Sequence, residues 1–154
     1  PLRIDDDPGA DAVFDLIAGG ILARSHEDHE ELWTFSPADV DTGAAPGGPV
    51  IPHARLGDIV VAWANDTLYG LAADDGTLLW QQNSAEPRCP CLGDGATLAH
   101  VTGTDESVLT GIDVATGQQT WQVPISDART VRHATDGDHL AVYTSFGLSL
   151  WSLR

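Results

Sequence analysis

Apolar and polar residues alternate over short runs along most of this chain, and turn residues separate one run from the next. The clearest example is Leu68–Trp80, where two apolar runs flank the polar stretch Asp74-Asp75-Gly76. An Asp-Gly pair in this position is typical of a β-hairpin, because the turn needs a positive φ angle that glycine adopts without steric cost. The pattern therefore predicts short antiparallel strands joined by tight turns.

The same pattern returns in Leu109–Trp121, which repeats Leu68–Trp80 at a fixed interval. Three pairs of residues are each separated by 41 positions: Gly70 and Gly111, Gly76 and Gly117, and Trp80 and Trp121. An interval of about 40 residues is the period of a β-propeller blade, which is a four-stranded antiparallel sheet. One blade cannot bury both of its faces alone, so we expect each Trp to be largely buried against a neighbouring blade.

This period divides the chain into four blade-like units, at about 12–51, 52–88, 89–130 and 131–154. The second unit is the clearest, with predicted strands at His53–Leu56, Ile59–Ala64, Thr67–Ala73 and Thr77–Gln82. The first unit has predicted strands at Val13–Ile17, Ile21–Ala23 and Glu31–Phe35. Its outer strand is either a degenerate one at Val50–Ile51 or is replaced by the loop rich in Gly and Pro before it. The last two units have predicted strands near Cys91–Leu92 and at Ala96–Thr102, Ser107–Val114, Gln118–Val123, His139–Thr144 and Gly147–Ser152.

The spacing apolar-Tyr-x-Leu-x-x-x-x-Gly-x-x-x-Trp in Leu68–Trp80 resembles the repeat of pyrroloquinoline-quinone-enzyme-type β-propellers. That repeat also occurs in the BamB-type envelope lipoproteins. The resemblance implies an all-β propeller of four-stranded antiparallel blades, with about four blade equivalents in this chain. It also implies blade-closing roles for the turn glycines and tryptophans of the two copies: Gly76, Gly117, Trp80 and Trp121. The motif is specific for the fold and says little about activity, since many such propellers bind no quinone.

The size of the ring depends on how the last unit is completed. That unit stops at Arg154, before the Trp-bearing strand that should come next. Leu2–Ile4 could supply the missing strand from the other terminus, which would give a four-bladed ring without open edges. The alternative is a partial ring, and we favour it because the propellers that this repeat resembles have seven or eight blades.

Composition limits the classes of partner. The chain of 154 residues is long enough for one domain with a real core, and it carries a formal net charge of −16. Such a charge repels nucleic acid and anionic lipid, so we expect no nucleic-acid binding. It suits a basic partner surface or divalent cations, although solubility explains it equally well.

The sequence also bears on location. The chain contains no run of apolar residues long enough for a membrane helix and no Met at all. We therefore expect it to begin inside a longer product or after a removed leader. A membrane anchor could have been lost with that segment. The resemblance to the BamB-type envelope lipoproteins implies an extracytoplasmic location, in the periplasm or at the cell surface.

Metal-ligating residue types are concentrated in one predicted hairpin tip, at His26, Glu27, Asp28 and His29. Imidazole and carboxylate groups at this spacing could bind zinc or another transition metal. Two histidines three positions apart make half a site, however, and a solvated loop is the favoured alternative. The acidic residues Asp5, Asp6, Asp7 and Asp11 could hold calcium, with a solvated turn again favoured.

The two cysteines, Cys89 and Cys91, flank Pro90. Alternate residues of an extended strand lie about 6.6 Å apart at Cα, near the upper limit for a disulfide. A structural disulfide and two free thiols both remain open. The quinone dehydrogenases place a disulfide between directly adjacent cysteines against their cofactor, and the intervening Pro90 breaks that match.

The sequence shows no arrangement of nucleophile and base and no glycine-rich phosphate loop. It therefore favours a non-catalytic propeller module for protein interaction or sensing in the cell envelope, without a cofactor and with a protein partner that it does not identify. One alternative is a fragment of a quinoprotein-type propeller enzyme. Another is a binding module that depends on a metal held by His26–His29.

Overall fold

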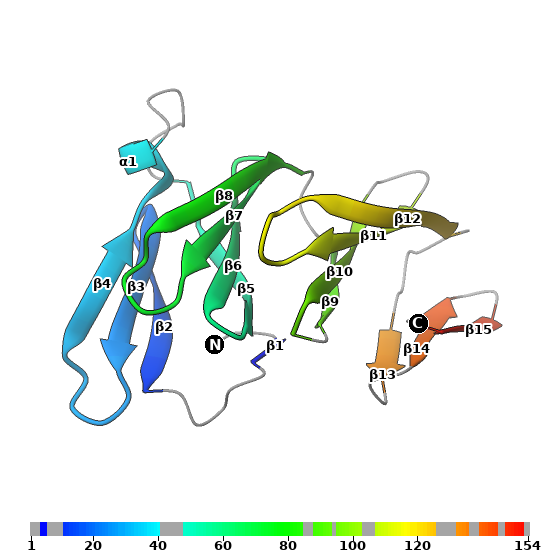
Figure 1. The fold of residues 1–154 in the computed structure, drawn as a ribbon, viewed down its shortest axis with the longest axis horizontal. Helices are drawn as coiled ribbons and strands as arrows, with labels where there is room; N and C mark the ends of the chain where they lie inside the picture. Colours follow the sequence, from blue (N-terminus) through cyan, green and yellow to red (C-terminus); the bar gives the residue numbers. More distant parts are fainter. Residues whose placement is uncertain are drawn as a thin grey trace.

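The computed structural model describes residues 4–5, 11–40, 48–84, 88–93, 95–102, 107–125, 132–135, 139–144 and 147–152. Within these residues the chain forms four sheets that follow one another along the sequence (Figure 1). The first sheet consists of β2 (Ala12–Ile17), β3 (Gly20–Ser25) and β4 (Glu31–Phe35). A single helical turn follows it, α1 (Pro37–Val40). None of the helices in the described part of the chain is long and apolar enough to cross a bilayer.

The other three sheets repeat this antiparallel plan. The second sheet consists of β5 (Ile51–Leu56), β6 (Ile59–Ala64), β7 (Thr67–Ala72) and β8 (Leu78–Asn83). The third consists of β9 (Arg88–Gly93), β10 (Thr97–Thr102), β11 (Ser107–Asp113) and β12 (Gln119–Ile125). The fourth consists of β13 (Arg132–Thr135), β14 (His139–Thr144) and β15 (Gly147–Ser152). The predicted all-β fold of antiparallel, blade-like sheets is thus confirmed, with four antiparallel strands in the second and third sheets and three in the described parts of the first and fourth. The described sheets form an open arc rather than a closed ring (Figure 1).

The N-terminal strand β1 (Ile4–Asp5) lies at the inner edge of the second sheet, where it pairs with β5 in the parallel sense. Ile4 is opposite Ala54 and Asp5 is opposite Arg55. The alternative in which Leu2–Ile4 completes the last unit does not agree with this pairing, because Ile4 pairs with the second sheet; Leu2 and Arg3 lie outside the described residues. The partial ring is the alternative that agrees with this pairing.

The first and second sheets are repeats of each other with an offset of 47 residues, because β2, β3 and β4 correspond to β6, β7 and β8 position by position. Trp33 is therefore the counterpart of Trp80. Each Trp is paired with a small residue in the neighbouring strand, as Ala23 with Trp33, Gly70 with Trp80 and Gly111 with Trp121. A β-bulge follows each of these pairs. Val50–Ile51 is not the outer strand of the first unit: β4 has that place, and Ile51 begins β5.

Trp33 and Trp80 each pack on the turn of the following sheet. The Trp33 indole N–H donates to the carbonyl oxygen of Ala73 (3.0 Å), and that of Trp80 donates to the carbonyl oxygen of Val114 (2.7 Å). A Cβ built on Gly76 would lie 2.6 Å from the Trp33 ring, and one on Gly117 would lie 2.4 Å from the Trp80 ring. The turn must therefore carry glycine, because only its bare Cα lets the indole approach so closely.

Two hydrophobic cores result, one at each junction. Alternate residues of β6 point to opposite faces of the second sheet, so Val60 and Ala62 join the core with the first sheet and Val61 joins the core with the third. Trp80 is 9% exposed and belongs to the second of these cores. Trp121 is only partly buried, which differs from the expectation of a largely buried side chain. The described residues include no turn glycine that packs on its indole as Gly76 and Gly117 pack on theirs.

Candidate functional site: a groove between the first two sheets

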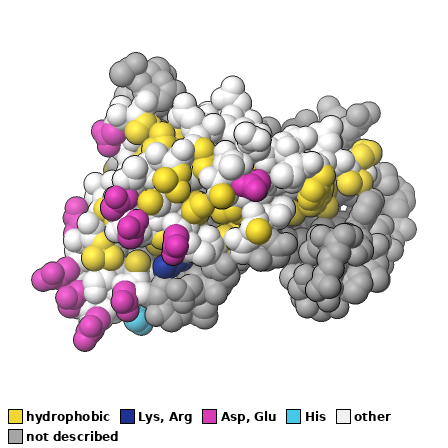
Figure 2. Space-filling model, viewed as in Figure 1, with side chains coloured by type: hydrophobic (Ala, Val, Ile, Leu, Met, Phe, Trp, Pro, Cys, Tyr) yellow, Lys and Arg dark blue, Asp and Glu magenta, His cyan; other side chains and the backbone are white. Residues whose placement is uncertain are grey.

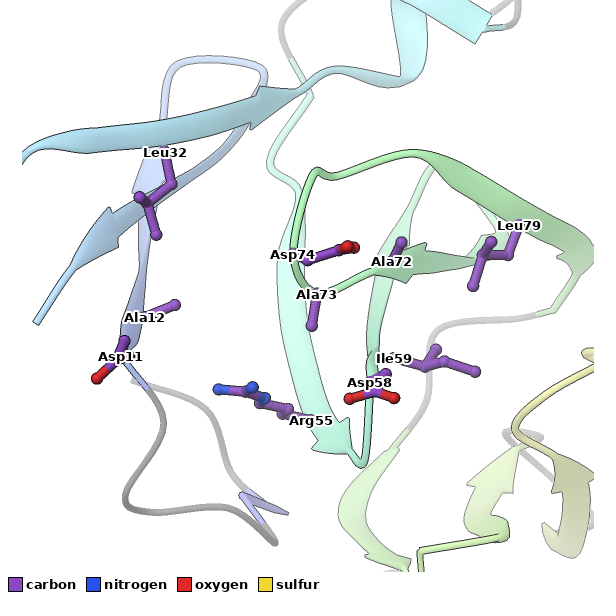
Figure 3. A pocket seen from close by; sticks show the side chains of 10 residues that line it. All are labelled: Asp11, Ala12, Leu32, Arg55, Asp58, Ile59, Ala72, Ala73, Asp74 and Leu79. Atoms are coloured by element: carbon purple, nitrogen blue, oxygen red, sulfur yellow. The ribbon is translucent and has the colours of Figure 1, made fainter.

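A groove of about 800 Å³ opens between the first and second sheets (Figure 3). Its apolar lining residues are Ala12, Leu32, Ile59, Ala72, Ala73 and Leu79. Its charged lining residues are Asp11, Arg55, Asp58 and Asp74. In Figure 3, Leu32 of β4 lies on one side and Leu79 of β8 on the other, with Ala72, Ala73 and Asp74 between them.

The two leucines reach the surface because of the bulges beside the tryptophans. In β4 the pairing steps from Trp33 to Glu31 and skips Leu32, and in β8 it steps from Trp80 to Leu78 and skips Leu79. A bulge re-aims the extra residue away from the regular pleat. Leu32 and Leu79 are each 49% exposed as a result, although neither has a polar group that would favour water.

The two flanking aspartates occupy equivalent turns. The backbone N–H of His26 donates to the carbonyl oxygen of Asp11 (2.6 Å), and that of Ala73 donates to the carbonyl oxygen of Asp58 (2.8 Å). Both hydrogen bonds close the end of a blade through the backbone alone. The carboxylates are therefore not needed for the turn, and both side chains line the groove.

The third sheet shows which of these residue types the fold itself demands. Val114 N–H donates to the carbonyl oxygen of Ala96 (2.9 Å), which makes Ala96 the counterpart of Asp58. The counterpart of Leu79 is the bulge residue Thr120, whose hydroxyl donates to the carbonyl oxygen of Gly111. The same backbone geometry is thus built with Ala and Thr, so neither an aspartate nor an exposed leucine is required by the blade.

Acidic side chains dominate the two sheets that form the groove. Residues 11–40 and 48–84 contain eleven Asp and Glu residues and two Arg. Figure 2 shows acidic side chains around the apolar ones on this face. The pKa of Asp75 is lowered by hydrogen bonds that its carboxylate accepts from the hydroxyl and the backbone N–H of Thr77. The pKa of Asp28 is lowered mainly by a hydrogen bond with the Ser25 hydroxyl and, to a smaller extent, by one from the backbone N–H of Glu30. Both exposed carboxylates are therefore ionised at neutral pH.

The His26–His29 segment is the blade turn of the first sheet. His29 N–H donates to the carbonyl oxygen of Ser25, as Gly76 N–H does to Ala72 and Gly117 N–H does to Asp113. The φ angles of these three residues are 61°, 73° and 70°. His29 therefore occupies the position of the turn glycine. Among the side chains that the structure describes, no three ligand types come together to hold a metal ion, and the metal hypothesis for His26, Glu27, Asp28 and His29 stays a prediction.

The described lining of the groove includes neither His53 nor His100. Cys89 and Cys91 both belong to β9, but their side chains lie outside the described residues, as do Asp6 and Asp7. The choice between a disulfide and two thiols stays open. His53 and His100 are buried within the sheets.

The chain matches the model of a known protein family. The model of the outer membrane protein assembly factor BamB matches residues 13–147. The chain belongs to the BamB-type family. The resemblance inferred from Leu68–Trp80 is thereby confirmed. Among curated proteins, none matches this chain at a significant level.

Solved structures of similar fold include members of both classes suggested by the repeat. BamB from Moraxella catarrhalis has 19% sequence identity and a TM-score of 0.67, with 97% of this chain and 45% of that protein covered. A europium-containing methanol dehydrogenase has 14% identity and a TM-score of 0.57, with 75% of this chain and 23% of that one covered. The computationally designed Ika4 protein has 16% identity and a TM-score of 0.64, with 94% and 87% covered. The chain thus spans less than half the length of that BamB.

Proposed function

We propose that this chain is a non-catalytic, protein-binding propeller module of the cell envelope, and that its partner docks in the groove between the first two sheets. The observation that carries the proposal is the pair of half-exposed leucines, Leu32 and Leu79, at equivalent bulges on its two sides. Membership of a family described as outer membrane protein assembly factors supports the class of function and the location.

The energetic argument concerns what the leucines would gain from a partner. Complete burial of a Leu side chain is worth about 1.5–3 kcal/mol, and about half of each of these two side chains remains exposed. A partner that covers both would recover roughly 1 kcal/mol from each. In the third sheet the same position carries Thr120, which offers no such gain.

A site-specific crosslink tests the proposal in the full-length protein and its own host. Leu79 is replaced by the photoreactive amino acid benzoylphenylalanine, and Thr120 is replaced in the same way as the matched control. We expect irradiation to give a discrete protein adduct from position 79 and none from position 120. Absence of an adduct at position 79, or the same adducts from both positions, would contradict the proposal.

Cell fractionation tests the location. We expect the protein in the envelope or periplasmic fraction, and its recovery with cytoplasmic markers would refute that part of the proposal.

A second candidate, from a different class, is a piece of a quinoprotein-type propeller enzyme. Its support is the likeness of fold to the methanol dehydrogenase and to the quinohemoprotein alcohol dehydrogenase from Comamonas testosteroni, which has a TM-score of 0.52. Titration with pyrroloquinoline quinone and calcium separates the two candidates. If the chain is a piece of a quinoprotein enzyme, we expect a saturable change in absorbance and in melting temperature. If it is a non-catalytic binding module, we expect neither change.

A further inference from the structure

We infer that the partner segment that docks in this groove is basic and carries apolar side chains between its Lys or Arg residues. The inference rests on the proposed function, because it assigns a chemical class to the partner at the same groove. Two features of the groove carry it. One is the apolar surface on both of its sides, and the other is the sign of the charge between and around those surfaces.

The apolar requirement follows from the repeat. The groove takes the same three positions from each of two sheets, so its lining contains repeat-equivalent pairs at the 47-residue offset: Asp11 and Asp58, Ala12 and Ile59, and Leu32 and Leu79. Each side therefore offers an apolar surface next to a carboxylate. A segment that covers both leucines needs apolar side chains of its own, since a purely polar one would leave them in contact with polar groups.

The charge requirement follows from the carboxylates. Three aspartates and one arginine line the groove, and Figure 3 shows Arg55 between Asp11 and Asp58, with Asp74 nearer the leucines. Residues 11–40 and 48–84 together contain eleven Asp and Glu residues against two Arg, and Arg24, the Arg outside the groove, pairs with Asp15 (3.3 Å). An approaching cationic segment is attracted by this field, and an anionic one is repelled.

Other occupants fit these observations less well. Nucleic acid is repelled by the net charge of −16, and a second copy of this chain carries the same charge. A metal ion would need converging ligands, and the described side chains contain no group of three that could hold one. A cationic segment with apolar side chains satisfies both the leucines and the aspartates.

The experiment uses a labelled nine-residue peptide of alternating Lys and Leu, with Gly-Ser at both ends, and measures fluorescence anisotropy against the intact protein. In one comparison peptide every Leu is replaced by Ser, and in the other every Lys is replaced by Glu. We expect saturable binding of the Lys-Leu peptide and no saturable binding of either comparison peptide. We also expect its affinity to fall when NaCl is raised from about 50 to about 300 mM, because exposed charges are screened.

Two pairs of variants locate the binding in the groove. Leu79→Ser should weaken binding about fivefold, the loss expected for the exposed half of one Leu side chain, while Thr120→Ser should leave it unchanged. Asp58→Asn should weaken binding about two- to fivefold, the range of one surface ion pair. Asp66→Asn removes the same charge at a turn outside the groove, where residue 66 has φ 59° and Asn is tolerated, and it should leave the affinity unchanged. All four positions are on the surface, and thermal melts verify that each variant folds.

The outcomes separate the inference from the proposed function. If the Lys-Ser or the Glu-Leu peptide binds as well as the Lys-Leu peptide, or if Asp66→Asn weakens binding as much as Asp58→Asn, the inference is wrong. If the Lys-Leu peptide does not bind while the crosslink at position 79 captures a protein, the inference falls and the proposed function stands. If both experiments fail, both fall.

Discussion

Replacing Trp33, which lies between the first and second sheets, with Ala should destabilise the protein far more than replacing Trp121 of the third sheet. In the Trp33→Ala variant, a side chain that is 7% exposed is lost from the core between the first two sheets. A large aromatic of this kind costs about 3–5 kcal/mol of unfolding free energy when it is truncated to Ala. The variant also loses the tilted ring contact with Phe14 (ring centroids 5.7 Å apart). It leaves the Ala73 carbonyl oxygen without its indole donor, which adds about 1 kcal/mol.

The Trp80→Ala variant should lose a similar amount, because the Trp80 indole packs on Gly117 and donates to Val114 in the same way. The Trp121→Ala variant should lose only about half as much, because that side chain is partly buried in the described structure. Trp121 still packs against Gly111, so some loss remains.

Urea unfolding followed by far-ultraviolet circular dichroism gives the free energy of unfolding of each variant from the midpoint and the slope. Asp74→Asn serves as the control, since an exposed turn residue should change stability by no more than about 0.5 kcal/mol. The reasoning is refuted if Trp121→Ala costs as much as Trp33→Ala, or if Trp33→Ala unfolds like the parent. The first result would mean that a further blade covers Trp121, and the second that the Trp-on-glycine contact does not join the blades.

Three further predictions concern turns and ionisable groups. Gly76→Ala and Gly117→Ala should each lower the free energy of unfolding by about 2 kcal/mol or more, because the new Cβ would overlap an indole and the φ angle is positive. His29→Gly, at the equivalent turn position, should be neutral or slightly stabilising. Thermal melts that rank His29→Gly as the most damaging of the three would overturn the equivalence of the turns. Because the pKa of Asp75 is below its ordinary value of 3.8, the stabilisation it provides is present above that pH and is lost as the pH falls through the lowered pKa. The difference in Tm between the parent and Asp75→Ala should therefore be present at neutral pH and shrink in strong acid, and a difference that grows in acid would contradict the assignment. Elemental analysis of protein purified without chelator should find no stoichiometric metal, and bound zinc that disappears in His26→Ala would instead establish the metal hypothesis.

Local patterns were sufficient to predict the blades. The alternation of apolar residues and the Asp-Gly and Thr-Gly turns depend on contacts within one hairpin, so they leave a periodic trace in the sequence. The predicted strands at Ile59–Ala64, His139–Thr144 and Gly147–Ser152 have the bounds of β6, β14 and β15. The 41-residue interval between Trp80 and Trp121 then indicated the propeller and its family, which the family match confirms.

The first blade and its strand at Glu31–Phe35 were predicted, but this strand was not recognised as the outer, Trp-bearing one, because the interval and the turn residue both differ from those of the other two copies. Trp33 precedes Trp80 by 47 positions, and His29 stands where the other turns have glycine. A search for the motif with Gly therefore does not identify Trp33 as the counterpart of Trp80. The Leu-Trp pair that occurs at both Leu32-Trp33 and Leu79-Trp80 could have indicated that the two strands are equivalent. Only the strand register, however, shows that each pair lies at an equivalent bulge.

The groove was decided by tertiary structure alone. Its lining residues come from two sheets and are separated by up to 68 positions, from Asp11 to Leu79, and no local pattern connects them. In sequence Leu79 reads as one more apolar strand residue and Asp58 as one more turn residue. Leu79 lines the groove because the strand pairing skips it at a bulge. The Asp58 carboxylate lines the groove because the turn is closed by the Asp58 backbone carbonyl and not by its side chain. Both features arise only when the two sheets are folded and packed.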